Sequence, residues 1–397
     1  MGLSAFANPS RCLKVTIVKN TSELREAQRS LRAFPKLAHI IDTEVPARQQ
    51  LNADWCLGLA RADGVEWLIH LDADELFYLH PPTTLKLHFD KLKQDNVGTI
   101  IYMNHEGIPE LGHENAGDVF HSITLFRKNF NSIALNSNAK RCIEYWQSRT
   151  AHGQYMISYD NGKAATRVVE NSSAAGVHAW KIRADAALPP SENSSTNTLS
   201  ATSTDTTFSE PLQNLKNVSC LSDVRTLDLS ALYRCDEACI LHFVVCGLYW
   251  YLKKYKILDS FPNSWFGGKL QILPCFHLDS RDRFLKGDFE SMCASYMNEV
   301  VLSEEGMAEK QIESGVCLRI DGIGKSILNE HERVWSIPFH PILQAYVTAD
   351  IMKRESNSMP ADIDTQVTKD ENLPLEKMWL LSSLVSQYLA PQSSQNK

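Results

Sequence analysis

The segment Asp72-Ala73-Asp74-Glu75 places three carboxylates within four residues, which gives it the clearest chemical potential in the chain. A mostly apolar run from Trp67 to Leu71 precedes it and predicts a short strand buried on both faces of a sheet. Three buried negative charges without a partner would cost several kcal/mol or would shift their pKa values. A divalent cation is a suitable partner, because it prefers oxygen ligands. The segment therefore indicates a metal-dependent site for a phosphate-bearing substrate, and the alternative is a strand end whose acids cap the next helix or face water.

The spacing of Asp72 and Asp74 suits a shared cation. Alternate residues of an extended segment point the same way, so both carboxylates can address one ion, directly or through water. Mn²⁺ or Mg²⁺ held by one or two carboxylates and by substrate phosphates matches this supply of ligands. Such an ion would hold a diphosphate and neutralise its charge as it leaves.

The same spacing begins a second chemistry, that of a DxD phosphatase. Phosphatases of the haloacid-dehalogenase type place Asp-x-Asp after an apolar strand, and their first Asp, here Asp72, is the nucleophile. They usually carry Thr or Val at the position that is Leu76 in this chain, and Asp279 and Asp282 are the residues that would have to serve as their downstream acidic pair. The phosphatase hypothesis therefore stays open as an alternative that fits the sequence less well.

The elements around the carboxylates alternate between strands and helices. We expect strands over 13–18 and 38–42, with a helix between them that opens at 21–24 with Ser22 as its cap. A helix from Pro46 to Gly64 shows a buried face in Leu51, Trp55 and Leu59. A helix over 84–92 and strands over 97–103 and 122–127 follow. This order is typical of βαβ units and predicts an α/β fold with a mostly parallel sheet flanked by helices.

Length and composition narrow the class of protein. A chain of 397 residues that is 43% hydrophobic can bury a sizeable core, in about two or three domains. The net charge of −7 shows no basic excess, which argues against nucleic acid as a general partner. No apolar run reaches the roughly 18 residues of a spanning helix, and the N-terminus lacks the features of a signal peptide.

The ten cysteines are scattered and form no CxxC pair. Neither a zinc site nor a disulfide scaffold is indicated, and we expect reduced or buried cysteines, with one or two disulfides as the alternative.

Several motifs together resemble the glycosyltransferase family-2-like proteins of plants, algae and related eukaryotes, which are similar in turn to glycosyltransferase family 92. The resemblance begins with Arg48-Gln49-x-Leu51-Asn52-Ala53 and the stretch from Trp67 to Phe77. It continues, in chain order, in Asn104-His105-Glu106-x-x-Pro109-Glu110, Leu125-Phe126-Arg127-Lys128-Asn129, Tyr159-x-Asn161-Gly162-Lys163-x-Ala165-x-Arg167-Val168, Gly176-Val177-His178, Ile240-Leu241-His242-Phe243, Lys254-Tyr255 and Phe276-His277-Leu278-x-Ser280-Arg281-Asp282. The matches extend from about residue 46 to residue 300.

The resemblance implies a GT-A-like (Rossmann-like) fold with a helical C-terminal region and an enzyme of the hexosyltransferase class. Such an enzyme moves a sugar from a nucleotide-diphosphate donor to a hydroxyl of a glycan or other acceptor, with Mn²⁺ or Mg²⁺. Asp74 would be the direct metal ligand, with Asp72 nearer the ribose or the waters of the ion. His178 would complete the metal shell, with His242 as the second choice. Relatives of this kind are expected in the Golgi or the secretory pathway.

Four further residues are candidates for binding and catalysis. Lys163 and Arg167 lie four apart, so on a strand they share a face and can meet phosphate oxygens; ordinary surface charge is the alternative. Glu106 and Glu110 are candidates for the general base that deprotonates the acceptor hydroxyl, because that task needs a carboxylate near the sugar. The alternative for both is a solvated glutamate.

The resemblance, together with changes in composition along the chain, also predicts how the chain is divided. We expect a nucleotide-sugar and metal core over 1–183, a disordered Ser/Thr/Asn-rich insertion over 184–232, a mostly helical remainder of the transferase over 233–350, and a loose tail with one short helix over 351–397. Only about 70 residues precede Asp72, so we expect a truncated or abbreviated base-binding unit. A catalytically impaired binding protein is therefore the second functional hypothesis.

Overall fold

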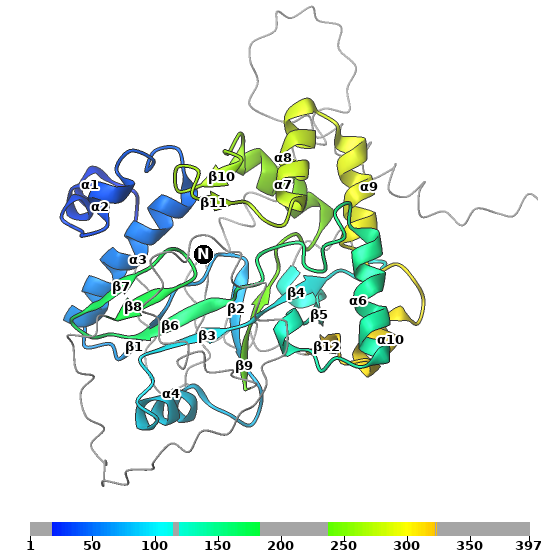
Figure 1. The fold of residues 1–397 in the computed structure, drawn as a ribbon, viewed down its shortest axis with the longest axis horizontal. Helices are drawn as coiled ribbons and strands as arrows, with labels where there is room; N and C mark the ends of the chain where they lie inside the picture. The colour runs from blue at the N-terminus through cyan, green and yellow to red at the C-terminus, as the bar shows by residue number, and fades with distance from the viewer. Residues whose placement is uncertain (1–17, 114–118, 183–236, 322, 324–397) are drawn as a thin grey trace, which may run out of the picture.

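The computed structural model describes residues 18–113, 119–182, 237–321 and 323. Nearly all of the predicted strand over 13–18, the predicted insertion over 184–232 and the predicted tail over 351–397 lie outside these residues. Within them, helices surround two sheets that meet near the middle of the molecule (Figure 1).

Three helices form the N-terminal part, namely α1 (Ser22–Arg29), α2 (Phe34–Leu37) and α3 (Val45–Ala62). Thr21, and not Ser22, caps α1, because its hydroxyl accepts a hydrogen bond from the N–H of Leu24 at 3.3 Å. The predicted strand over 38–42 is wrong, since this segment forms turns after α2. Ile40 and Ile41 look like strand residues, but here turns bury them against α2 and α3 in a small core of their own.

The larger sheet has five strands, in the spatial order β12 (Cys317–Arg319), β5 (Leu125–Arg127), β4 (Asn104–Ile108), β9 (Ala238–His242) and β2 (Glu75–Leu79). Only β4 and β9 pair in parallel, and the other neighbours are antiparallel. The predicted parts over 1–183 and 233–350 share this sheet, because β9 and β12 come from the second of them.

The smaller sheet has three strands, in the order β1 (Trp67–Ile69), β6 (Lys163–Arg167) and β3 (Thr99–Tyr102). Both outer strands pair with β6 in antiparallel fashion. Two short antiparallel pairs accompany it, β7 (Ser172–Ala174) with β8 (Trp180–Ile182), and β10 (Ser264–Trp265) with β11 (Leu270–Gln271). The side chains of α3 pack on this side of the molecule, against β6, β7 and β8.

The predicted Rossmann-like, mostly parallel sheet is therefore wrong for the described residues, whose sheets are mixed and mostly antiparallel. The βαβ pattern had a real basis, since β1 and β3 run in the same direction with α4 (Leu85–Gln94) between them in the chain. However, β6 arrives from far along the chain and inserts between them. Periodicity identifies strands but carries no information on such distant partners.

Most of the remaining helices form two packed groups. α7 (Leu248–Leu258), α8 (Phe276–Lys286) and α9 (Phe289–Glu299) share one apolar core. α6 (Ser137–Arg149) and α10 (Met307–Glu313) lie side by side and form a second one (Figure 1). Two short helical segments, α5 (Val119–Ser122) and the 3-10 helix η1 (Phe130–Ser132), flank β5.

The sequence also predicts that the chain has no membrane-spanning helix and that its cysteines are reduced or buried. Among the described residues, no helix is both long and apolar enough to span a membrane. The seven cysteines in the described part of the chain are all free thiols, as the sequence favoured. Cys12, Cys220 and Cys235 lie outside that part.

Candidate active site

Asp72 and Asp74 lie in the turn that joins the two sheets, between the end of β1 and the start of β2. Glu75 is the first residue of β2, so the carboxylates connect two short strands and do not follow one long strand. Two hydrogen bonds close the turn. The N–H of Glu75 donates to the carbonyl of Asp72 at 3.1 Å, and the N–H of Asp72 donates to Glu75 Oε2 at 2.7 Å. This fixed turn positions all three acids.

Asp72 is held from two sides. Its Oδ2 lies 2.6 Å from Lys163 Nζ, and its Oδ1 accepts a hydrogen bond from the Gln49 side chain at 2.6 Å. Burial alone would raise the pKa of Asp72, but the ammonium of Lys163 outweighs burial and the pKa is lowered. Lys163 also lies 3.5 Å from Glu75 and above the ring of Tyr159. The structure thus brings Lys163 to the acids as predicted, but as a fully buried partner.

Asp74 faces a different lysine. Its Oδ2 lies 3.1 Å from Nζ of Lys254, which reaches the turn from α7, and 3.7 Å from Nε2 of His242 at the end of β9. Burial opposes ionisation of Asp74, yet Lys254 and His242 hold its pKa well below the usual value. Sequence reasoning missed Lys254 as a site residue, although the Lys254-Tyr255 match was the signal that marked it.

Of the two candidate histidines, His242 is the one beside Asp74. The Nδ1 of His178 lies 2.8 Å from the carbonyl oxygen of Gly162, and its ring packs on Tyr159. Burial, together with the nearby Lys163, lowers the pKa of His178 to about 3, so the imidazole is neutral near pH 7. Its role as a metal ligand stays a prediction.

A row of ionisable side chains crosses the larger sheet next to Asp74. Glu75 on β2 pairs with His242 on β9, His242 pairs with Glu106 on β4, and Glu106 pairs with Arg127 on β5. Directly opposed residues point to the same face of a sheet. The row therefore links the turn with the acids to the predicted base Glu106.

Glu106 is almost completely buried, and both of its carboxylate oxygens are used. Arg127 Nη2 lies 2.6 Å from Oε2, and the backbone N–H groups of Ile157 and Ser158 donate to Oε2 and Oε1 at 3.2 and 2.6 Å. The Ser158 hydroxyl donates to Glu106 as well, and it lies 3.1 Å from His242 Nδ1. Glu106 is therefore connected to Asp74 by a chain of contacts that runs through the Ser158 hydroxyl and the ring of His242.

Glu110 and Arg167 are not brought to the acids by any contact that joins the described residues. Both oxygens of Glu110 bind Arg319 of β12, at 2.8 and 2.9 Å. Arg167 is opposite Trp67, at the start of β1, whereas Lys163 lies beyond the end of that strand and next to the acids. Their predicted roles in catalysis and phosphate binding stay predictions.

The side chains at this site fit Mn²⁺ or Mg²⁺ poorly as they stand. Within 18–113, 119–182, 237–321 and 323, no group of three or more His, Cys, Asp or Glu side chains is arranged to hold a metal ion. Each aspartate already has an ammonium partner, so an incoming ion would compete with Lys254 for Asp74. The divalent ion stays a prediction from the sequence.

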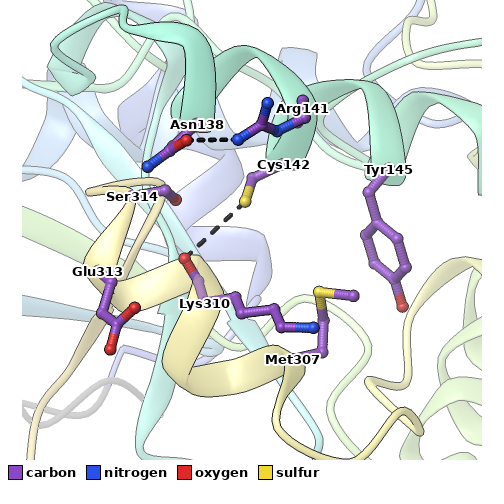
Figure 2. A pocket seen from close by; sticks show the side chains of 8 residues that line it. All are labelled: Asn138, Arg141, Cys142, Tyr145, Met307, Lys310, Glu313 and Ser314. Atoms are coloured by element: carbon purple, nitrogen blue, oxygen red, sulfur yellow. Dashed lines mark hydrogen bonds between the residues drawn. The ribbon is translucent and has the colours of Figure 1, made fainter.

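A shallow pocket of about 420 Å³ lies away from these residues, between α6 and α10 (Figure 2). It is lined by Asn138, Arg141, Cys142, Tyr145, Met307, Lys310, Glu313 and Ser314. None of the acids of the turn contributes to it, so it is not part of the candidate active site.

Comparison with known proteins supports a relationship to glycosyltransferase-like proteins. No protein-family model matches the chain, and no solved structure matches it. A 192-residue stretch, 45% of this chain, is 30% identical to Glycosyltransferase-like At3g57200 of Arabidopsis thaliana and covers 36% of that protein. A stretch of the same length is 28% identical to Glycosyltransferase-like At2g41451 of the same plant and covers 41% of it.

The chain is a distant relative of plant glycosyltransferase-like proteins. The aligned part of the chain spans well under half the length of these relatives. Membership in glycosyltransferase family 2 or family 92 stays a prediction.

Proposed function

We propose that the protein is a glycosyltransferase that moves a hexose from a nucleotide-diphosphate donor to a hydroxyl of a glycan or other acceptor. The observation that carries the proposal is the similarity to two glycosyltransferase-like proteins. The carboxylate–lysine turn between the sheets is the place where we assign the reaction, because charged side chains concentrate there in a partly buried setting.

The donor diphosphate is assigned to the Asp74 side of the turn. Lys254 is partly exposed there and carries the positive charge that a leaving diphosphate needs. On the other side, Lys163 and Gln49 hold Asp72 rigid, where it can accept hydrogen bonds from donor hydroxyls. Arg167, the last residue of β6, would join the phosphate only if its side chain moved from its place opposite Trp67 toward the turn.

The acceptor hydroxyl needs a group that removes its proton. In this proposal Glu106 is a positioning residue, because the Ser158 hydroxyl that binds it also contacts His242. His242 then presents Nε2 toward the turn. Glu110 stays a candidate base that would first have to leave Arg319.

Mn²⁺ or Mg²⁺ is part of the prediction from sequence, with Asp72, Asp74 and His178 as its ligands. If bound, the ion would supply positive charge to the departing diphosphate. No step of the proposal depends on it.

Transfer can be tested with a panel of UDP- and GDP-sugars by measuring the released nucleoside diphosphate, in EDTA and with Mn²⁺. Asp74→Ala is expected to lower turnover by about 10²-fold or more, because it releases Lys254 and misplaces the charge that stabilises the leaving group. Asp279→Asn is the matched control, since Asp279 pairs with His152 on the surface. Unchanged turnover in Asp74→Ala would remove Asp74 from the reaction.

The phosphatase alternative has less support from this geometry. A nucleophilic Asp72 would have to attack with an oxygen that already accepts a hydrogen bond, from Lys163 at Oδ2 or from Gln49 at Oδ1. The impaired binding protein differs from the main proposal in one measurable way: it would bind donor without releasing nucleoside diphosphate.

A further inference from the structure

The two lysines of the turn have different surroundings. Lys163 Nζ is enclosed by Asp72, Glu75 and the ring of Tyr159, and its side chain has no exposed surface. The side chain of Lys254 is 27% exposed, beside Asp74, which is 33% exposed. Lys163 therefore has no surface that a ligand can contact, whereas the side chain of Lys254 is partly exposed.

The ammonium of Lys254 also retains a donor for a ligand. A lysine ammonium has three N–H donors. Two of them point to Asp74 Oδ2 at 3.1 Å and to the carbonyl of Val244 at 3.0 Å. These two acceptors fix the position of the charge, and the third N–H donor is left for an anion.

A metal is predicted at this site because three carboxylates would otherwise lack a cation. However, Asp72 already accepts hydrogen bonds from Lys163 and Gln49, and Glu75 already accepts one from the Tyr159 hydroxyl. The side chains of Asp72 and Asp74 are exposed to a similar extent, 28% and 33%, and Lys254 neutralises Asp74. A divalent ion would have to displace that ammonium and break its ion pair before binding.

We propose that Lys254 is the resident cation of this site and binds the diphosphate of the ligand directly, in place of a divalent ion. The inference rests on the proposed function for the identity of its ligand, a nucleoside diphosphate-sugar. Charge-assisted hydrogen bonds from an ammonium to phosphate oxygens are among the stronger polar contacts in proteins. Asp74 and the Val244 carbonyl hold the ammonium ready for this contact.

Calorimetric titration with inorganic pyrophosphate tests the diphosphate contact alone, because pyrophosphate carries neither a base nor a sugar. The full chain is titrated in EDTA and again with Mn²⁺. We expect binding in EDTA that weakens about tenfold or more in Lys254→Met and is largely kept in Lys254→Arg. Lys253→Met is the matched control, because the neighbouring Lys253 packs over the rings of Tyr249 and Trp250.

The variant Asp74→Asn distinguishes anion binding by the Lys254 ammonium from anion binding by a metal ion on Asp74. If Lys254 holds the anion, this variant still binds pyrophosphate, because the Asn side-chain oxygen can accept from the ammonium as Asp74 Oδ2 does. If a metal ion on Asp74 holds the anion, binding is lost. Asp74→Asn and Lys254→Arg also decide the matter if thermal unfolding shows that Lys254→Met is not folded.

The inference is overturned by binding that appears only with Mn²⁺, by no binding in either buffer, or by unchanged affinity in folded Lys254→Met. Metal-dependent binding together with sugar transfer would leave the proposed function intact. Metal-free binding that needs Lys254, without any release of nucleoside diphosphate from the donor panel, would support the inference and contradict the transferase.

Discussion

At the scale of single residues, the site is a set of charges that satisfy one another. Asp72 has Lys163, Asp74 has Lys254, and Glu106 has Arg127. The pairs differ in exposure, since the Glu106–Arg127 pair is almost completely buried. Breaking a buried pair leaves an uncompensated charge, which costs far more than breaking a pair at the surface.

This difference leads to a stability prediction for Arg127. We expect Arg127→Met to lower the free energy of unfolding by about 3–5 kcal/mol, because Glu106 would remain charged in the core. Chemical denaturation with urea measures the effect. Arg319→Met is the matched control, because its partner Glu110 is partly solvated, and its cost should be within about 1 kcal/mol. Equal losses in both variants would show that the buried pair has no special role.

The sequence identifies the carboxylates of the site more completely than the cations that pair with them. Asp72, Asp74 and Lys163 were recognised from residue type and spacing, and the structure brings them together. Lys254 is separated from Asp74 by 180 positions, and no local pattern reports that contact. Local spacing also could not reveal that Glu106 is enclosed, because Arg127 and Ser158 reach it from other strands and loops.

At the scale of elements, the site depends on β6, which separates β1 from β3. Gly162 comes just before β6, with φ of +70°, in the left-handed region that favours glycine. A Cβ at this position would lie 2.4 Å from the carbonyl oxygen of Tyr102, which pairs with Lys163 across the sheet. The close approach of two backbones at Gly162 therefore helps to place Lys163 beside Asp72.

Gly162→Ala should accordingly cost more than the conformational penalty alone. That penalty is about 1–2 kcal/mol for a left-handed residue, and the clash with the backbone of β3 adds to it. Gly153→Ala is the matched control, since Gly153 has φ of +65° but open space around its Cα. Thermal unfolding of both variants measures the difference. An equal loss of stability would mean that the approach to Tyr102 relaxes without cost.

The same strand explains why the sheet prediction failed. Most predicted elements exist, including the helix from Val45 to Ala62 and the strand from Thr99 to Tyr102. The pairing of β6 with β1 and of β9 with β2 joins segments far apart in the chain. Strand direction follows from those distant pairings, so alternation of helices and strands was not sufficient to predict a parallel sheet.

At the scale of the whole molecule, buried neutral histidines should make folding sensitive to acid. Burial lowers the pKa of His105 to about 4, and it lowers the pKa of His88 as well. Both are buried in the native protein, where His105 Nδ1 accepts the N–H of Asn129 and His88 Nε2 lies beside the hydroxyl of Tyr102. Protonation of either ring would place a positive charge in the core.

The sign of the pH effect follows from these lowered pKa values. Above about pH 6.5 each histidine is neutral in both the folded and the unfolded state and contributes nothing. As the pH falls below that value, the unfolded chain takes up the proton first, so the free energy of unfolding decreases. For His105 the decrease is about 1.4 kcal/mol per pH unit and ends near pH 4, where the folded state also becomes protonated.

The contribution of His105 can be isolated with His105→Asn, whose side-chain oxygen can accept the N–H of Asn129 in place of Nδ1. Urea unfolding between pH 7.5 and 4.5 gives the free energy of unfolding as a function of pH. For His105→Asn this free energy should fall less steeply with decreasing pH than in the wild type, by up to the contribution of one proton, about 1.4 kcal/mol per pH unit. His113→Asn, at an exposed position, should keep the wild-type slope. If His105→Asn also keeps that slope, His105 is protonated equally in both states, and the acid sensitivity of the fold must come from other buried groups, with His88 the first to test.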